Sequence, residues 1–390
     1  MGAAGGDDGA VGQVKQATGR RIGDIECLRG VAVLMVVMWH AHGALFGWPM
    51  PIWDHITNNY FATWPGVDLF FAISGFVIAR SLLPSLRNAT QPAVIVAAFW
   101  IRRVWRLFPS AFVWLAIIQI GCVVFNRSGV FGTFHTNFES ALAGMLSVAN
   151  FREAAAFGHF GYGPSGPYWS LSLEEQFYLL LPFTVLLAGR WLTTVLVVAT
   201  LAVFVLPNEH WVMDFRVHAI LLGVLLAIAE EHPLYQALSP TMFKRSPLLG
   251  LMFACAMVLA MSALAPYGQM IFLHPLDMIA VLCVLLVFVA SQDGDVLFRP
   301  RIIKHPLTWI GTRSYAIYLV HLPAFCISRE FLFRLLPAGH ALAPSDTLPL
   351  ATLTFATIVC LAELNYRILE VPLRLRGVSI ARQLEDSFGI

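Results

Sequence analysis

Arg29 and His40 lie at the two ends of one apolar segment, Arg29-Gly-Val-Ala-Val-Leu-Met-Val-Val-Met-Trp-His40, which carries no other ionisable side chain. Eleven residues turn a helix through about 1100°, close to three turns, so both side chains project from one face about 16 Å apart along the axis. If the segment spans a membrane, the arginine lies at one surface and the imidazole near the bilayer middle. An ionisable group is costly there, so the pair indicates a two-point functional site.

Three more ionisable side chains interrupt apolar segments far along the chain: Glu174, Glu175 and His321. A histidine in mid-helix is by itself more often a hydrogen-bonded core residue than a catalyst. Their joint occurrence favours function, because an apolar bundle has no reason to bury several such groups unless they face one another or a wet cavity.

Structural explanations also exist for the polar residues around these segments. Ser172 followed by Glu175 fits a helix-capping pattern, and Asp68 fits an acid in the first turn of a helix. Ser74 and Gly75 fit a close helix contact. Each of these alternatives stays open at the level of the sequence.

The elements that must position these residues are membrane helices. The chain is 58% hydrophobic and 12% charged, which indicates an all-α polytopic membrane protein. Its net charge of +2 gives no indication of a nucleic-acid partner, and we expect none. The six cysteines lie singly in or beside apolar runs, so we expect neither a disulfide framework nor a metal site.

The hydropathy pattern predicts about ten spans, with nine to eleven as the range. They cover about 28–47, 65–83, 107–125, 168–188, 191–206, 214–230, 248–265, 271–290, 312–334 and 347–369. Residues 1–22 are predicted to be a disordered cytoplasmic leader, 23–376 the membrane domain and 377–390 a cytoplasmic tail. The first apolar run is long and many spans follow it, so we interpret it as a retained helix rather than a signal peptide.

Charge asymmetry orients the chain. With both termini in the cytoplasm, most Lys and Arg residues fall on the inner side. Arg29 then lies at the cytoplasmic surface, with His40 and His321 near mid-membrane and Glu174 and Glu175 about two turns below the outer surface. The basic, aromatic segment 93–106 fits either an interfacial amphipathic stretch or a ligand-binding segment.

The motifs, taken together, resemble acyltransferase family 3, whose members are integral membrane proteins that O-acylate sugars and other hydroxyl acceptors. They run in the family's order over about 26–372. The matching segments are Glu26-Cys-Leu-Arg29-Gly30 followed by His40; Gly66-Val-Asp-Leu-Phe-Phe-Ala-Ile-Ser-Gly75-Phe; Arg102-Arg103-Val-Trp-Arg106-Leu-Phe-Pro109; Trp169-Ser-Leu-Ser-Leu-Glu174-Glu175-Gln-Phe-Tyr178; Gly311-Thr-Arg-Ser-Tyr315-Ala-Ile-Tyr318-Leu-Val-His321; and Glu370-Val-Pro372.

The resemblance implies a donor, an acceptor and a location. The donor is an acyl-CoA, usually acetyl-CoA, used as a substrate and not bound permanently. The acceptor is a hydroxyl of a glycan or a lipid-linked sugar, such as a precursor of a surface or exopolysaccharide. The location is the bacterial inner membrane, in contact with lipid. The chain continues only briefly beyond the last predicted span, so we expect it to lack the hydrolase-like domain of some members.

The resemblance also implies roles for individual residues. Arg29 and the cluster Arg102, Arg103 and Arg106 are predicted to hold the nucleotide phosphates of the donor. His40 is predicted to act as a general base or as an acylated nucleophile.

The remaining roles are assigned more broadly. Glu174 or Glu175 would orient the histidine or bind sugar hydroxyls, and His321 would stabilise the oxyanion or carry a second proton. Further substrate contacts are predicted at Asp68, Ser74, Trp169 and Tyr315.

Two alternatives to acyl transfer remain at this stage. A proton-coupled transporter or a transbilayer acyl shuttle would use the buried His and Glu residues as a relay. We find no internal repeat relating the two halves, and the arginine-lined cytoplasmic surface suits a phosphorylated ligand better. A scaffold without chemistry would leave the ionisable groups in the membrane unexplained.

Overall fold

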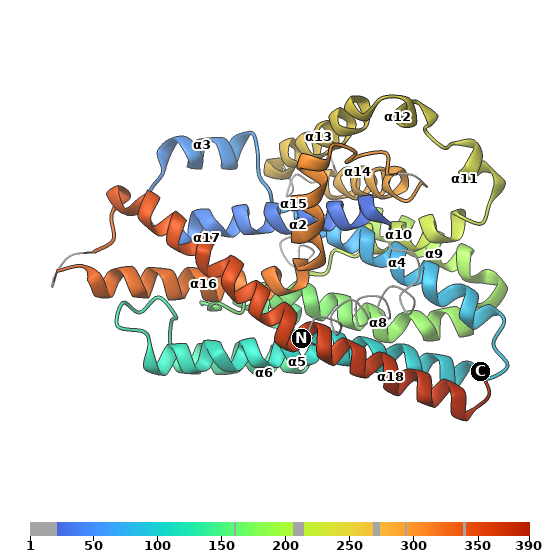
Figure 1. Cartoon of the computed structure of the whole chain (residues 1–390), viewed down its shortest axis with the longest axis horizontal. Helices are drawn as coiled ribbons and strands as arrows, with labels where there is room; N and C mark the ends of the chain where they lie inside the picture. Colours follow the sequence, from blue (N-terminus) through green and yellow to red (C-terminus); the bar gives the residue numbers. More distant parts are fainter. Residues whose placement is uncertain (1–21, 160, 206–213, 268–273, 293–294, 338–340) are drawn as a thin grey trace, which may run out of the picture.

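The protein is an all-α bundle in the computed structural model, which describes residues 22–390 except 160, 206–213, 268–273, 293–294 and 338–340 (Figure 1). The predicted leader 1–22 falls almost entirely outside the described residues. The helices are α2 (Gly23–His40), α3 (Pro51–Asn59), α4 (Gly66–Arg87), α5 (Pro92–Val124), α6 (Phe134–Met145), α7 (Ala149–Ala156), α8 (Tyr168–Ala188), α9 (Leu192–Val205), α10 (His218–Ala229), α11 (Pro233–Ala237), α12 (Thr241–Arg245), α13 (Pro247–Leu264), α14 (Pro275–Ala290), α15 (Arg301–Thr312), α16 (Ser314–Leu335), α17 (Thr347–Leu364) and α18 (Val371–Ser387).

Every one of the ten predicted ranges contains a helix. In the described part of the chain, seven helical stretches are long and apolar enough to cross a membrane, and α10 and α14 are apolar but shorter. The chain is thus a multi-pass membrane protein, and the count of ten spans stays a prediction. One boundary is sharp: Gly189 ends α8 with a φ of +49°, a conformation that favours glycine.

Glycines set the closest helix contacts. α4 packs against α10 and α2 against α15 (Figure 1). A Cβ added at Gly75 would overlap the carbonyl oxygen of Ile220, and one at Gly311 would overlap that of Glu26. Missing side chains therefore let these backbones approach closely, which confirms the small-residue packing expected at Gly75.

Helix α5 differs from the prediction. The sequence predicted a span at 107–125 and considered an interfacial stretch at 93–106, but one helix of 33 residues runs through both. Pro109 lies inside it without ending it. The reason is tertiary: α18 packs along α5, with Gly377 seated against the side chain of Trp105. The basic motif is therefore part of the helix bundle.

Candidate active site

A histidine pair joins the first and the ninth predicted spans. α16 packs against α2, and this contact brings the His321 Nε2 atom to 3.2 Å from the His40 Nδ1 atom. The two rings lie 5.0 Å apart between centroids. His321 is fully buried at 0% exposure, whereas His40 is half-buried. The predicted meeting of these histidines is thus present in the structure.

The hydrogen bonds of the pair define which nitrogens carry protons. His40 Nδ1 lies 2.9 Å from the Val36 carbonyl oxygen, and His321 Nδ1 lies 2.7 Å from that of Tyr318. A carbonyl can only accept, so both Nδ1 atoms are the protonated donors in neutral rings. His321 Nε2 therefore presents a lone pair to the His40 Nδ1–H, which it shares with the Val36 carbonyl oxygen. His40 Nε2 is left as an unprotonated nitrogen.

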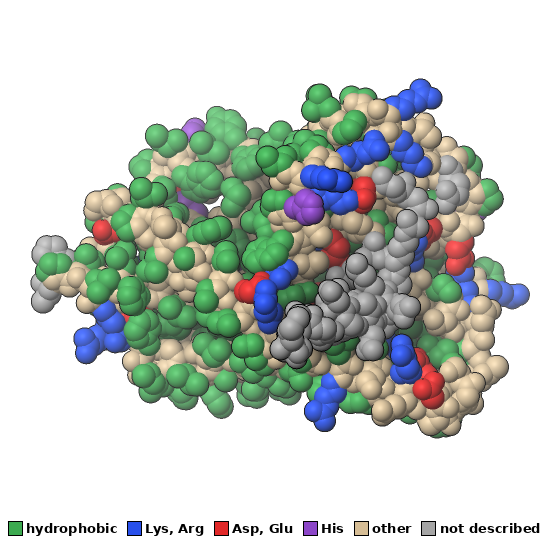
Figure 2. Space-filling view, in the orientation of Figure 1, with side chains coloured by type: hydrophobic (Ala, Val, Ile, Leu, Met, Phe, Trp, Pro, Cys, Tyr) green, Lys and Arg blue, Asp and Glu red, His purple; other side chains and the backbone are tan. Residues whose placement is uncertain are grey.

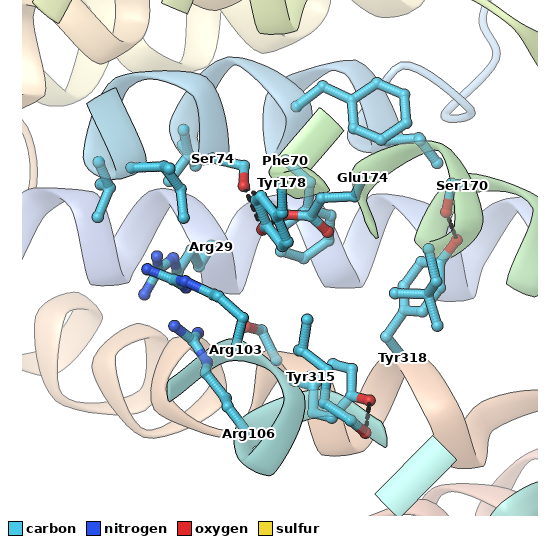
Figure 3. A pocket seen from close by; sticks show the side chains of 18 residues that line it. Arg29, Phe70, Ser74, Arg103, Arg106, Ser170, Glu174, Tyr178, Tyr315 and Tyr318 are labelled. Carbon is cyan, nitrogen blue, oxygen red and sulfur yellow. Dashed lines mark hydrogen bonds between the residues drawn. The ribbon is translucent and has the colours of Figure 1, made fainter. Parts of the chain in front are cut away.

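A second group, the arginine pocket, lies around Arg29, Arg103 and Arg106. It is a cavity of about 80 Å³ lined also by Ser74, Glu174, Tyr178, Ser170, Tyr315 and Tyr318. Figure 3 shows the three guanidinium groups together at one end, Ser74, Tyr178 and Glu174 in the middle, and Ser170 with Tyr318 at the other end. The buried Arg106 Nε has no hydrogen-bond partner among the described residues, which leaves a donor for an anionic ligand.

Arg102 does not line this pocket, so the structure does not bring it together with the other arginines predicted to bind the donor. Its Nη1 donates to Glu385 on α18 at 2.8 Å. Arg103, the next residue, lies over the Phe99 and Tyr178 rings, with its central guanidinium carbon 5.6 and 5.3 Å from their centroids. Successive helical residues point about 100° apart, and here Arg103 lines the pocket while Arg102 points toward α18.

Glu174 and Glu175 separate in the same way. Glu174 accepts hydrogen bonds from Ser74 and Tyr178 inside the arginine pocket. Glu175 accepts from the Ser147 hydroxyl at 2.5 Å, at the connection between α6 and α7. Neither carboxylate contacts the histidines in the described part of the chain. Glu174 thus lies in the arginine pocket, among the residues predicted to bind the donor, rather than beside the histidines.

His40 lines a different and larger space, the histidine cavity, of about 480 Å³. Its wall comes from α2, α3, α4, α7, α8, α16 and connecting segments: Val36, Trp39, His40, Thr57, Asn58, Ala62, Trp64, Val67, Glu153, Phe157, Trp169, Asp214, Arg216, Ala265, Pro266 and Tyr318. Aromatic rings, two carboxylates and one guanidinium in a space of this size suit a small polar ligand.

Charged groups are concentrated on one wall of the histidine cavity. Burial, and to a smaller extent the Asp214 charge, raise the pKa of the Glu153 carboxyl to about 7, against the opposing effect of Arg152. Burial also raises the pKa of Asp214 to about 6, against the effect of Arg216. Glu153 Oε2 is buried without a hydrogen-bond partner among the described residues. These carboxyls are poised to exchange protons or bind hydroxyls near neutral pH.

The predicted substrate contacts are divided between the two spaces. Trp169 lines the histidine cavity, whereas Ser74 and Tyr315 line the arginine pocket. Asp68 lines neither space: its carboxylate pairs with Arg216 Nε at 3.2 Å. The substrate role of Asp68 stays a prediction, and in the structure the residue pairs with Arg216, whose guanidinium stacks over the Trp169 ring at 5.0 Å.

Comparison with known proteins matches this architecture. A family model described as an acyltransferase domain covers residues 22–363. The chain belongs to acyltransferase family 3. Family 3 membership confirms the resemblance of the motifs.

Three bacterial relatives illustrate the similarity. Peptidoglycan O-acetyltransferase OatA of Listeria monocytogenes is 27% identical over 90% of this chain and 56% of its own length. The putative peptidoglycan O-acetyltransferase YrhL of Bacillus subtilis is 27% identical over 92% of this chain and 56% of its own. A putative O-acetyltransferase of Staphylococcus aureus is 24% identical over 92% and 58%. The chain thus spans little more than half the length of these relatives. No solved structure matches it.

Several residues that line the arginine pocket or the histidine cavity were not among the site residues predicted from the sequence. Tyr178 follows Glu174 by four residues and Tyr318 precedes His321 by three, so helical spacing could have placed both beside their partners. Glu153 and Asp214 gave no such signal. Glu153 lies on the short helix α7 and Asp214 precedes α10, and only the tertiary fold brings both to the wall of the histidine cavity.

Proposed function

We propose that the chain moves an acyl group, most simply acetyl, from cytoplasmic acyl-CoA to a hydroxyl of a glycan or glycoconjugate at the outer face of the bacterial inner membrane. The observation that carries the proposal is the His40–His321 pair, with its free His40 Nε2, beside a cavity separate from the arginine pocket. Transport would not require an activated nitrogen of this kind.

The arginine pocket suits the donor. Arg29, Arg103 and Arg106 offer charge-assisted hydrogen bonds to the phosphates of CoA, and guanidinium groups pair with phosphate oxygens in a bidentate way. Arg29 and His40 are about 16 Å apart along α2, by the helical rise, which is of the order of an extended pantetheine arm. The thioester would then reach His40 while the nucleotide stays with the arginines.

The distribution of charge supports the sidedness. On the face drawn in Figure 2, Lys and Arg side chains gather mostly over the half where α12 and α18 lie, and hydrophobic side chains dominate the opposite half. Cytoplasmic ends of membrane helices carry such an excess of basic residues. Arg29 near the start of α2 would accordingly lie toward the cytoplasm, where acyl-CoA occurs.

The chemistry follows from the proton positions. His40 Nε2 takes the proton of the acceptor hydroxyl as its oxygen attacks the thioester carbonyl. The carbon–sulfur bond then breaks, and the CoA thiolate takes the proton back from the imidazolium. His321 Nε2 accepts the His40 Nδ1–H throughout, so it holds the ring in position and stabilises its cationic form.

A covalent variant uses the same atoms. His40 Nε2 attacks the thioester first, the carbon–sulfur bond breaks, and the CoA thiolate leaves as the thiol with the remaining ring proton. The neutral acyl-imidazole then passes the acyl group to the acceptor oxygen, and the ring takes up the proton of the acceptor hydroxyl. Two-substrate kinetics separate the routes, because a covalent intermediate gives ping-pong patterns. In both routes His321 is a positioning residue.

The histidine cavity suits a sugar. Trp64 and Trp169 offer ring faces, and Glu153 and Asp214 offer acceptors for hydroxyl hydrogens. Two of the relatives are named for peptidoglycan, which makes a cell-wall glycan the first acceptor to test.

The test uses purified protein with labelled acetyl-CoA and peptidoglycan fragments. His40→Ala should lose at least about 100-fold in acyl transfer, the scale of removing a positioned base. His42→Ala is the matched control, because His42 is a neighbouring histidine that pairs with Asp54 and does not line the histidine cavity. Near-normal transfer by a well-folded His40→Ala protein would refute the mechanism.

A further inference from the structure

The arginine pocket and the histidine cavity are adjacent but separate. Their walls share two residues, Val67 on α4 and Tyr318 on α16. The groups suited to the donor phosphates lie on one side of these residues, and His40 lies on the other. A donor held by the arginines therefore meets the Val67–Tyr318 wall before its thioester meets His40.

Tyr318 is held firmly in this wall. Its hydroxyl donates to the Pro167 carbonyl oxygen at 3.0 Å and shares a hydrogen bond of 2.5 Å with the Ser170 hydroxyl. Its ring packs edge-on against Phe70, with centroids 6.1 Å apart. Only 6% of the residue is exposed. Figure 3 shows the Ser170–Tyr318 pair at the end of the pocket opposite the guanidinium groups.

The same residue is linked to the histidine pair. The Tyr318 carbonyl oxygen accepts the Nδ1–H of His321, which in turn faces His40. The centroids of the Tyr318 and His321 rings lie 5.7 Å apart. Movement of the Tyr318 side chain would therefore occur beside the histidine pair, at the point where the acyl group has to arrive.

We propose that Tyr318, together with Val67, forms a partition that the acyl-pantetheine arm displaces to reach His40, and that otherwise keeps water in the histidine cavity away from the donor. This inference rests on the proposed function for its ligand, and on cavity geometry for the partition itself. Tyr318 acts as a positioning residue: it limits the loss of acyl groups to water, in which acyl-CoA and water give a carboxylic acid and free CoA thiol.

An accessibility experiment tests the partition without any acyl transfer. In a variant whose six native cysteines are replaced, Val77→Cys places a thiol in the wall of the arginine pocket, and Asn58→Cys places one in the wall of the histidine cavity. A small, charged, impermeant methanethiosulfonate is added to proteoliposomes from the side on which Asn58→Cys reacts.

From that side, Val77→Cys should be almost unreactive with Tyr318 present and at least about ten times faster with Tyr318→Ala. Tyr318→Phe keeps the ring and should remain close to wild type. Tyr235→Ala is the matched control, because Tyr235 is 5% exposed, is hydrogen-bonded to Ser291 and lines neither space. An unchanged rate in Tyr318→Ala, or an equal increase in Tyr235→Ala, would overturn the partition.

A second measurement tests whether the partition limits hydrolysis of the donor by water. Free CoA thiol released from acetyl-CoA without acceptor should rise several-fold in Tyr318→Ala relative to wild type and to Tyr318→Phe. Reagent access without increased CoA release would retain the partition and refute its role in excluding water. If wild-type protein does not turn over acyl-CoA even with acceptor, the proposed function fails, while the accessibility result still decides on the partition.

Discussion

Truncation of His321 tests the central arrangement, because this residue touches His40 but lines neither cavity. His321→Ala removes one of the two acceptors that share the His40 Nδ1–H and leaves the Val36 carbonyl oxygen as the other. A neutral hydrogen bond contributes about 0.5–1.5 kcal/mol net, and one to a charged group about 1.5–3 kcal/mol. The bond strengthens by about 1–2 kcal/mol when His40 becomes cationic, which corresponds to a rate loss of about 5- to 30-fold.

The assay is steady-state acyl transfer with purified variants, with kcat and KM determined separately. His321→Ala should lower kcat and leave KM for acetyl-CoA nearly unchanged, because His321 does not contact the arginine pocket. His321→Gln should recover much of the rate, since its amide oxygen can accept the same N–H. His321 is fully buried, so the variants are compared at matched yield and melting temperature.

Two results would refute this reasoning. A loss in His321→Ala as large as that in His40→Ala would indicate that His321 acts directly on the reacting atoms. A kcat equal to that of wild type would show that the 3.2 Å contact between the rings has no role in the reaction. Failure of His321→Gln to exceed His321→Ala would likewise argue against hydrogen-bond acceptance as the function.

Two further predictions concern the walls of the two cavities. Arg106→Lys keeps the charge but loses the planar fork, so the Kd for CoA should rise about 10-fold in a binding titration, whereas Arg102→Lys, outside the pocket, should bind like wild type. Equal affinity in all three proteins would exclude Arg106 from donor binding. Burial and Asp214 raise the pKa of Glu153 from 4.5 to about 7, against the effect of Arg152, so its contribution to stability is present below pH 4.5 and is lost as pH rises to 7. Glu153→Gln should therefore melt at the same temperature as wild type at pH 4. At pH 8 it should melt at a higher temperature, because its free energy of unfolding should exceed that of wild type by up to about 3 kcal/mol. Identical melting temperatures at pH 8 would contradict this.

The sequence alone determined the helices, and residue type alone identified the candidate site residues. Apolar runs of spanning length predict membrane helices because the backbone must satisfy its hydrogen bonds internally in lipid. The placement of Arg29 and His40 on one helix follows from local geometry, and all ten predicted ranges proved helical. Motif order also predicted the family, because each motif is too short to be specific but the ordered set over the whole chain is specific.

Tertiary structure decided which of these residues face one another. Neighbours on a helix point about 100° apart, so a small rotation of each helix determines whether Glu174 or Glu175 enters the arginine pocket, and whether Arg103 or Arg102 does. Sequence spacing along one helix contains no information on that rotation, which depends on contacts such as the close approach of backbones at Gly75 and Gly311. The separation of the Arg29 and His40 sites by Tyr318 arises in the same way, because the partition comes from α16, nearly three hundred residues away in sequence from the helix whose two ends it divides.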